Sequence, residues 1–226
     1  MGQIVSNMKN ILSVDFDAIL YPCIQLYNDK VIGSENPTVM WKILDRDIGI
    51  IEHIRYDANL LQSISSIMED AVLNGSKFYA IETHDQIIDI LREDEDFDKI
   101  DRGGNHINLV NIDFHHDILY SKESEDSIIS YDEYTCADWV GYLKFHEYLN
   151  TYTWVHAANS SFPDPNLIKG LHFDTIPNKD IGKIKIPFDK VFFCLSPQWV
   201  PYQYHHLYDM IKNSCERIQK KVGGNK

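Results

Sequence analysis

The sequence places two carboxylates and an imidazole at alternate positions directly after an apolar segment, residues 107–112. Asp113, His115 and Asp117 form this group. Alternate side chains of an extended chain share a face, and the third can join the first two where the strand ends. Burying such groups unpaired costs several kcal/mol each, and a divalent ion offsets that cost. The pattern predicts metal ligation, against the alternative of a solvated loop with incidental acids.

Two further polar groups follow apolar segments in the same way. Asp15 and Asp17 come after residues 11–14, and His84 comes shortly after residues 77–81. Taken alone, a capped turn explains the aspartates and a helix cap explains the histidine. Ligands of open parallel sheets bind beyond the carboxyl ends of the strands. We therefore expect the three groups to meet at one edge of a sheet.

Together the three groups supply four aspartates and two histidines as candidate metal ligands: Asp15, Asp17, His84, Asp113, His115 and Asp117. Four carboxylates balance the charge of two divalent ions. A ligand set rich in oxygen, with two imidazoles and no thiolate, favours Mn²⁺ over Zn²⁺, with iron or cobalt as alternatives. Two ions about 3.5–4 Å apart activate water and stabilise the group under attack. The sequence therefore predicts a dinuclear hydrolase.

Strands that alternate with helices must position these side chains. The alternation predicts one α/β domain over residues 1–226, with three layers, α/β/α, and a mainly parallel sheet. Apolar runs predict strands at 11–14, 77–81, 107–112, 151–155 and 191–195. Helical spacing predicts helices at 56–74, 85–92, 139–149 and 204–218. We expect irregular chain at 27–37, loops at 93–104 and 121–130, and a frayed tail from about 220.

The composition narrows the class of protein. The 226 residues include 21 Lys+Arg and 34 Asp+Glu, a net charge of −13, and 44% of them are hydrophobic. These values exclude global disorder and argue against nucleic acid as a partner. No apolar run approaches the roughly 18 residues of a membrane span, and no signal peptide is evident, so we expect a cytoplasmic protein without a membrane partner. Residues 1–6 fit a myristoylation pattern, which we interpret as a chance match. We expect free thiols at the four scattered cysteines, Cys23, Cys136, Cys194 and Cys215.

The metal-ligand segments carry a family resemblance. The Asp113-x-His115-x-Asp117 segment resembles the D-x-H-x-D motif of the arginase (ureohydrolase) superfamily. Ser13-x-Asp15-x-Asp17, with Pro22, resembles its S-x-D-x-D-x-x-D-P motif. His84 is similar to the lone upstream histidine ligand of that family. Here the two motifs come in the opposite order from classical arginases, and the chain is shorter.

With residues 136–140 and 195–199 downstream, the chain looks most like the compact peptide arginases. Those enzymes convert arginine side chains of ribosomally made peptides to ornithine with release of urea. The resemblance implies two Mn²⁺ ions and an arginine-containing precursor peptide as the partner. It also implies that Asp15 and Asp113 bridge the ions. His84 and Asp117 would complete one ion, and His115 and Asp17 would complete the other.

The reaction needs two helpers that the motifs leave open. A general acid must protonate the departing amine, and a carboxylate is expected to hold the guanidinium group. Gln198 follows the last predicted strand, where the family places its guanidinium-side acid, so Glu82 or Asp138 is the alternative for that role. Glu82 is also a candidate supporter of His84, because we expect the two on one strand face. For the acid, His116 is the first candidate, with His146 and His156 as alternatives.

Three competing functions remain open. Asp15-x-Asp17 after an amino-terminal strand also resembles the opening of haloacid-dehalogenase-type phosphatases, with Asp15 as the nucleophile. That interpretation leaves His84 and the 113–117 segment without a purpose. A small-molecule ureohydrolase would release urea from free arginine or agmatine. A non-catalytic, metal-stabilised peptide-binding module would bind metal and release no urea.

Overall fold

The structure is a computed structural model of the chain that describes residues 8–21, 31, 34–93, 106–120 and 122–224. The myristoylation pattern, Pro22, Cys23 and nearly all of the expected 93–104 loop lie outside these residues. Among the described residues, Cys136, Cys194 and Cys215 are free thiols. No helix of the described chain is long and apolar enough to cross a membrane.

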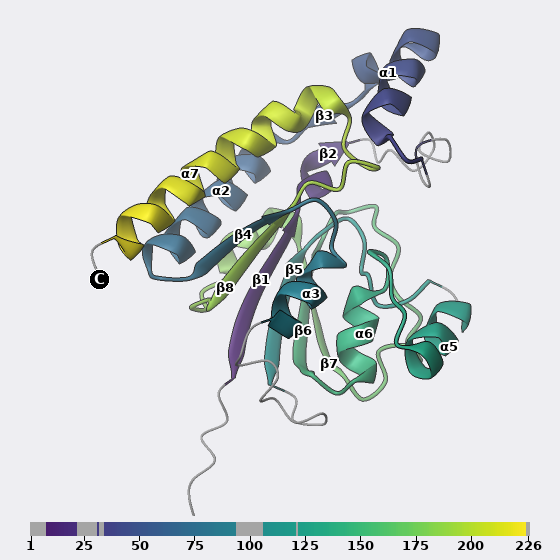
Figure 1. Cartoon of the computed structure of the whole chain (residues 1–226), viewed down its shortest axis with the longest axis vertical. Helices are drawn as coiled ribbons and strands as arrows, with labels where there is room; N and C mark the ends of the chain where they lie inside the picture. Colours follow the sequence, from purple (N-terminus) through teal and green to yellow (C-terminus); the bar gives the residue numbers. More distant parts are fainter. Residues whose placement is uncertain (1–7, 22–30, 32–33, 94–105, 121, 225–226) are drawn as a thin grey trace, which may run out of the picture.

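A six-stranded sheet forms the centre of the molecule (Figure 1). The strand order is β4-β8-β1-β5-β6-β7, and every neighbouring pair runs parallel. In that order the strands are Lys77–Ile81, Lys190–Cys194, Lys9–Asp15, Ile107–Ile112, Leu149–His156 and His172–Pro177. A small antiparallel sheet pairs β2, Leu20–Tyr21, with β3, Arg55–Tyr56.

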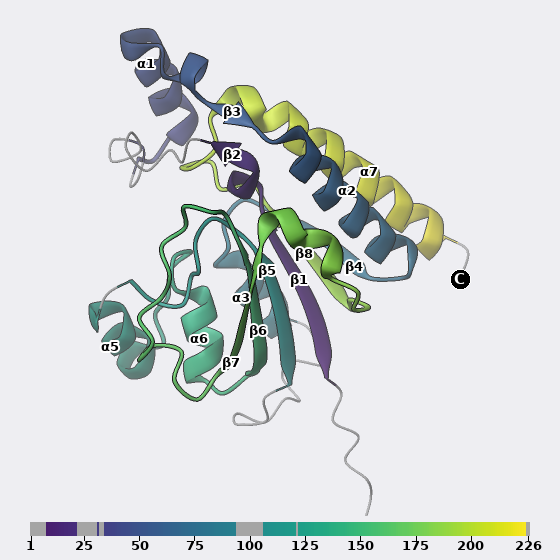
Figure 2. The same ribbon diagram turned by 180° about the vertical axis from the view of Figure 1, so that it is seen from behind.

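Helices cover both faces of the sheet, which confirms the predicted three-layer α/β fold. On one face α2, Ala58–Leu73, lies beside α7, His205–Gly223. On the other lie α3, Gln86–Glu93, and α6, Trp139–Phe145, with α5, Lys122–Tyr131, beside α6 (Figures 1 and 2). Helix α1, Pro37–Ile48, lies near the small sheet. Short 3₁₀ helices span Phe16–Ile19, Ile50–His53, Asn178–Lys183 and Tyr202–Tyr204.

The alternation of side chains along β1 explains the two helical layers. Leu12 and Val14 are fully buried in the core under α2 and α7, whereas Ile11 is buried in the core under α3 and α6. A strand that is buried on both faces reads as a continuous apolar run, as this one does. The same alternation sends Ser13 and Asp15 toward the α3 and α6 side. The polar side chains at the end of β1 therefore lie on the face of the sheet that α3 and α6 cover.

The structure corrects several predicted element bounds. Residues 122–131 form helix α5 where a loop was predicted at 121–130, and among its described side chains, 124–131, Ile128 alone is buried in the core. A polar helix with one core residue has little apolar periodicity, so its sequence reads as a loop. The helix predicted over 139–149 ends at Phe145, and β6 begins at Leu149. The tail predicted to fray from about 220 stays helical to Gly223.

Helix α1 and strand β7 are the longest helix and the longest strand among the remaining elements that were not predicted. Helix α1 begins with Asn36, whose side chain accepts a hydrogen bond from the Val39 N–H, and with Pro37 in its first turn. Both are signals of a helix start. Strand β7 is largely exposed at the edge of the sheet, so it lacks the apolar run that marks a central strand.

Candidate metal centre

The six candidate ligands meet at the carboxyl ends of adjacent strands. Asp15 ends β1, and Asp113 follows β5 directly. His84 follows β4, which is joined to β1 through β8. All of these ends lie on the same edge of the sheet because the strands are parallel, and that edge is where such sheets bind ligands.

One imidazole lies among three carboxylates. His84 Nδ1 is 3.1 Å from Asp117 Oδ2, 3.6 Å from Asp15 Oδ2 and 3.6 Å from Asp113 Oδ2. All four side chains are buried. We call Asp15, His84 and Asp117, with the near oxygen of Asp113, the His84 position. Such a group of one nitrogen and several oxygens suits a divalent transition metal ion.

The second imidazole lies on the other side of Asp113. His115 Nδ1 is 3.3 Å from Asp17 Oδ2 and 3.8 Å from Asp113 Oδ1. We call Asp17 and His115, with this oxygen of Asp113, the His115 position. The two oxygens of one buried carboxylate therefore face two different imidazoles. A carboxylate in this arrangement can bridge two ions.

Hydrogen-bond donors hold the carboxylates of the His84 position. Ser196 Oγ donates to Asp15 Oδ2 at 2.6 Å, and Trp139 Nε1 donates to Asp117 Oδ2 at 2.9 Å. Asn111 Nδ2 donates to Asp113 Oδ2 at 3.2 Å. Partners of this kind orient metal ligands and raise their affinity.

Local backbone strain also supports the His84 position. Asp117 and Ser196 have positive φ angles of 50° and 49°, which residues other than glycine rarely adopt. The N–H groups of Val140 and Gly141, at the start of α6, donate to the Asp117 carbonyl. A Cβ on Gly141 would lie 1.9 Å from the Ile118 carbonyl oxygen, so only glycine lets α6 approach this turn.

The electrostatics of the cluster indicate a need for positive charge. Burial, with the nearby Asp17 charge, raises the pKa of Asp15 to about 7, and burial and the aspartate charges raise the pKa of Asp113 well above its ordinary value. Burial alone would lower the pKa of His115, but the Asp17 hydrogen bond and the surrounding carboxylates raise it to about 9. The protons that these groups retain offset charge that a bound cation would otherwise neutralise.

Two atoms of the His115 position also lack a partner. Asp17 Oδ1 and His115 Nε2 are buried without a hydrogen bond among the described residues. A buried polar atom with no partner costs free energy, and a ligand can supply the missing interaction. The donor set, its charge and these atoms therefore fit divalent metal ions. These buried groups of Asp and His could therefore hold metal ions.

A cavity of about 340 Å³ opens over the two positions. Asp15, His84, His115 and Asp117 form part of its wall, and Trp199 packs against the His115 ring with centroids 4.4 Å apart. The other lining residues are Thr83, Tyr120, Cys136, Ala137, Ser196 and Gln198. A space of this size holds one small molecule or one long side chain.

Of the four predicted helper residues, only Gln198 lines this cavity. Glu82 is exposed, because β4 ends at Ile81 and the chain turns, so Glu82 and His84 do not share a strand face as expected. The Asp138 carboxylate accepts hydrogen bonds from the Thr135 N–H and hydroxyl groups.

The candidate proton donors also lie outside the cavity wall. His116 Nδ1 accepts a hydrogen bond from the Ile118 N–H, and burial lowers the pKa of His116 to about 4, so its ring is neutral at pH 7. His146 Nε2 lies 3.1 Å from Asp132 Oδ1. His156 Nδ1 lies 2.8 Å from the Ala157 carbonyl oxygen.

Sequence reasoning missed several residues that shape the site. Ser196 and Trp139 hold the ligands Asp15 and Asp117, and Tyr120 and Trp199 line the cavity. The one signal for them in the sequence was the likeness of two segments, residues 136–140 with Trp139 and residues 195–199, to those of the peptide arginases. Comparisons of the chain with protein-family models, curated proteins and solved structures gave no significant match. The chemistry of the site therefore has to be argued from its own residues.

Proposed function

We propose that the protein is a dinuclear metal-dependent hydrolase that converts arginine side chains of a peptide to ornithine and urea. The observation that carries this proposal is the placement of Asp113. Its two oxygens lie 3.6 and 3.8 Å from His84 and His115, on opposite sides of one buried carboxylate. This supports two adjacent ions rather than one.

The residues divide between the ions as follows. Asp15, His84 and Asp117 would hold one ion, Asp17 and His115 would hold the other, and Asp113 would serve both. The preponderance of carboxylate oxygens favours Mn²⁺. When bound, two such ions supply an activated water and stabilise the charge that develops on the group under attack.

The cavity supports an arginine side chain as the substrate. Its volume of about 340 Å³ accommodates one long side chain, while the main chain of a peptide would remain outside. The net negative charge of the chain attracts a cation. A planar guanidinium can stack on the Trp199 ring and donate to the side-chain oxygen of Gln198.

Tyr120 can orient the reacting group. The Tyr120 side chain is half exposed, but desolvation of its hydroxyl group and the charges of Asp117 and Asp113 raise its pKa above the ordinary value of 10.0, so the phenol stays protonated at neutral pH. Its oxygen accepts a hydrogen bond from the His116 N–H at 3.1 Å. Its own proton can therefore be directed at a nitrogen or oxygen in the cavity.

The test combines metal analysis with mass spectrometry of an arginine-containing peptide incubated with the protein and Mn²⁺. We expect about two ions per chain and a loss of roughly 42 Da per arginine, the CN₂H₂ difference that hydrolysis to urea produces. Asp113→Ala protein, purified identically, is the control for contaminating activity. Urea from free arginine or agmatine alone would indicate a small-molecule ureohydrolase. Two bound ions with no hydrolysis of the peptide, of free arginine or of agmatine would reject the arginine hydrolase and indicate a peptide-binding module.

A further inference from the structure

A thiol lies within the His84 position. Cys194 is the last residue of β8 and is completely buried. Strand β8 lies between β4 and β1, and its register pairs Cys194 with Ile81 on one side and with Asp15 on the other. Directly paired residues of neighbouring strands project to the same face of a sheet. The thiol therefore lies on the same side of the sheet as the Asp15 carboxylate.

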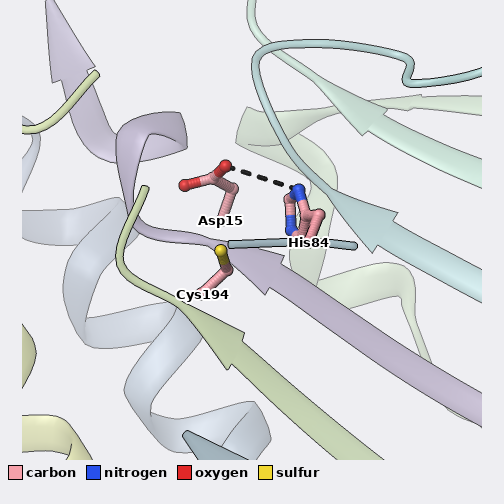
Figure 3. A group of neighbouring side chains, drawn as sticks. All are labelled: Asp15, His84 and Cys194. Atoms are coloured by element: carbon pink, nitrogen blue, oxygen red, sulfur yellow. Dashed lines mark ion pairs between the residues drawn. The ribbon is translucent and has the colours of Figure 1, made fainter. Parts of the chain in front are cut away.

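Figure 3 shows the Cys194 sulfur close to the Asp15 and His84 side chains. One ligand atom from each of the three residues lies within 4.8 Å of the other two. Carboxylate, imidazole and thiolate are all ordinary ligands of divalent transition metals, and all three side chains here are buried. An ion between them would be enclosed by the protein.

A second contact fixes the thiol relative to the carboxylate. Ser196 Oγ is 3.3 Å from Cys194 Sγ and donates to Asp15 Oδ2 at 2.6 Å. The positive φ of Ser196 turns the chain after β8 so that its side chain reaches both groups. With Cys194 counted, each of the four adjacent strands β4, β8, β1 and β5 either ends in a candidate metal ligand or is followed by one within three residues.

We propose that Cys194 is a thiolate ligand of the ion in the His84 position, so that this position prefers a thiophilic ion such as Zn²⁺ while the His115 position prefers Mn²⁺. The proposal rests on the metal centre of the proposed function, and not on its reaction, and it changes the preferred metal of one position. On binding, the sulfur forms a bond to the ion and its proton passes to solvent. Sulfur ligands favour softer ions, whereas the His115 position offers two carboxylates and an imidazole.

Cobalt(II) provides a direct readout, because a cobalt–thiolate bond adds a near-ultraviolet charge-transfer band that oxygen and nitrogen ligands do not give. We expect this band when metal-free protein is titrated with Co²⁺, and we expect Cys194→Ser to lose it while still binding cobalt. The matched control is Cys136→Ser, because Cys136 also lines the cavity but belongs to no group of neighbouring ligand atoms in the described chain. That variant should keep the band.

Competition between metals gives a second measurement. Cys194→Ser should lower the affinity for Zn²⁺ by about tenfold or more and change the affinity for Mn²⁺ by less than about threefold. Circular dichroism checks that the variant is folded. A wild-type protein that holds two cobalt ions without the band, or a Cys194→Ser variant that keeps it, would overturn the proposal.

The outcomes separate this proposal from the proposed function. A charge-transfer band in a protein that never releases urea would support the thiolate ligand and reject the arginine hydrolase. Urea release with two bound ions and no band would do the reverse. A protein that binds no metal would overturn both.

Discussion

The two candidate metal positions both combine carboxylates with one imidazole, but they differ in how the fold supports them. In the His84 position the imidazole is 3% exposed, and Ser196 and Trp139 hold the carboxylates. In the His115 position the imidazole is 14% exposed, and Asp17 Oδ1 and His115 Nε2 have no hydrogen-bond partner in the described chain. The ligands of the first position are therefore held in place by the protein itself, whereas those of the second would depend on a bound ion for their missing contacts. We expect the His84 position to bind its ion more tightly.

Asp113→Ala should disrupt both metal positions, because this side chain belongs to both. Its removal leaves three buried carboxylates and two imidazoles without the group between them. We expect the loss of both ions and of all hydrolysis, measured by elemental analysis after dialysis. Retention of two ions would show that Asp113 does not bridge.

His84→Ala and His115→Ala should separate the two positions. We expect His115→Ala to retain one tightly held ion and His84→Ala to retain at most one weakly held ion. Equilibrium dialysis with Co²⁺, the ion titrated into both positions above, measures the number and affinity of ions in each variant. Equal affinities in the two variants would remove the distinction between a preorganised and an ion-dependent position.

The stability of the metal-free protein should fall as the pH rises from about 6.5 to 9, the range in which His115 titrates; from pH 4 to 6.5 the lowered pKa of His116 opposes the raised pKa of Asp15. Burial and Asp17 raise the pKa of Asp15 from 3.8 to about 7, and the carboxylates around His115 raise its pKa from 6.5 to about 9 despite its burial. Each group binds more protons folded than unfolded, so its stabilising effect is complete below the unfolded pKa and lost as the pH rises through the folded pKa. The expected slope is about −1.4 kcal/mol per pH unit for each group while it titrates.

Thermal unfolding in chelator from pH 4 to pH 9 measures this dependence. Bound metal should reverse this dependence, so that stability rises with pH, because ions bind the deprotonated ligands. Asp15→Asn, which resembles the protonated carboxyl, should remove the contribution of Asp15 and make stability rise more with pH below pH 7 than in the wild type. A melting temperature of the chelated wild type that rises between pH 6.5 and 9 would contradict the raised pKa of His115.

Gly141→Ala should weaken the His84 position selectively. The added methyl group would collide with the Ile118 carbonyl and push α6 away from the turn that holds Asp117. We expect a loss of about 1–3 kcal/mol in the free energy of unfolding, and weaker binding at the His84 position. Gly182→Ala is the control, because a Cβ there meets no atom within 4 Å. Equal effects of the two substitutions would refute the packing argument.

His146→Ala should have the smallest effect on the metal centre. His146 contacts Asp132 and packs on Tyr142, away from the candidate ligands. We expect unchanged metal content and a modest loss of stability by thermal unfolding. Loss of an ion would mean that the ligand set of one position has been assigned incorrectly.

Much of the fold could be predicted from the sequence because its main strands and helices show local patterns of apolar residues. The central strands β1, β5 and β8 are largely buried on both faces, so they appear as apolar runs that lead into polar residues. Exposed strand β7 and polar helix α5 have no such pattern, because they contribute few residues to the core. Their structure depends on neighbours that are distant in the sequence.

The residue types at the strand ends can be read from the chain, and so can their faces within one strand, because side-chain alternation is local: Ser13 and Asp15 of β1 had to share a face. The side chains that surround them follow from the assembly of the sheet. Strand order places Cys194 beside Asp15, which lies 179 residues earlier in the chain, and the turn after β4 takes Glu82 out of the site. Spacing along the chain reports the face of a strand, but contacts between strands follow from how the whole sheet is assembled.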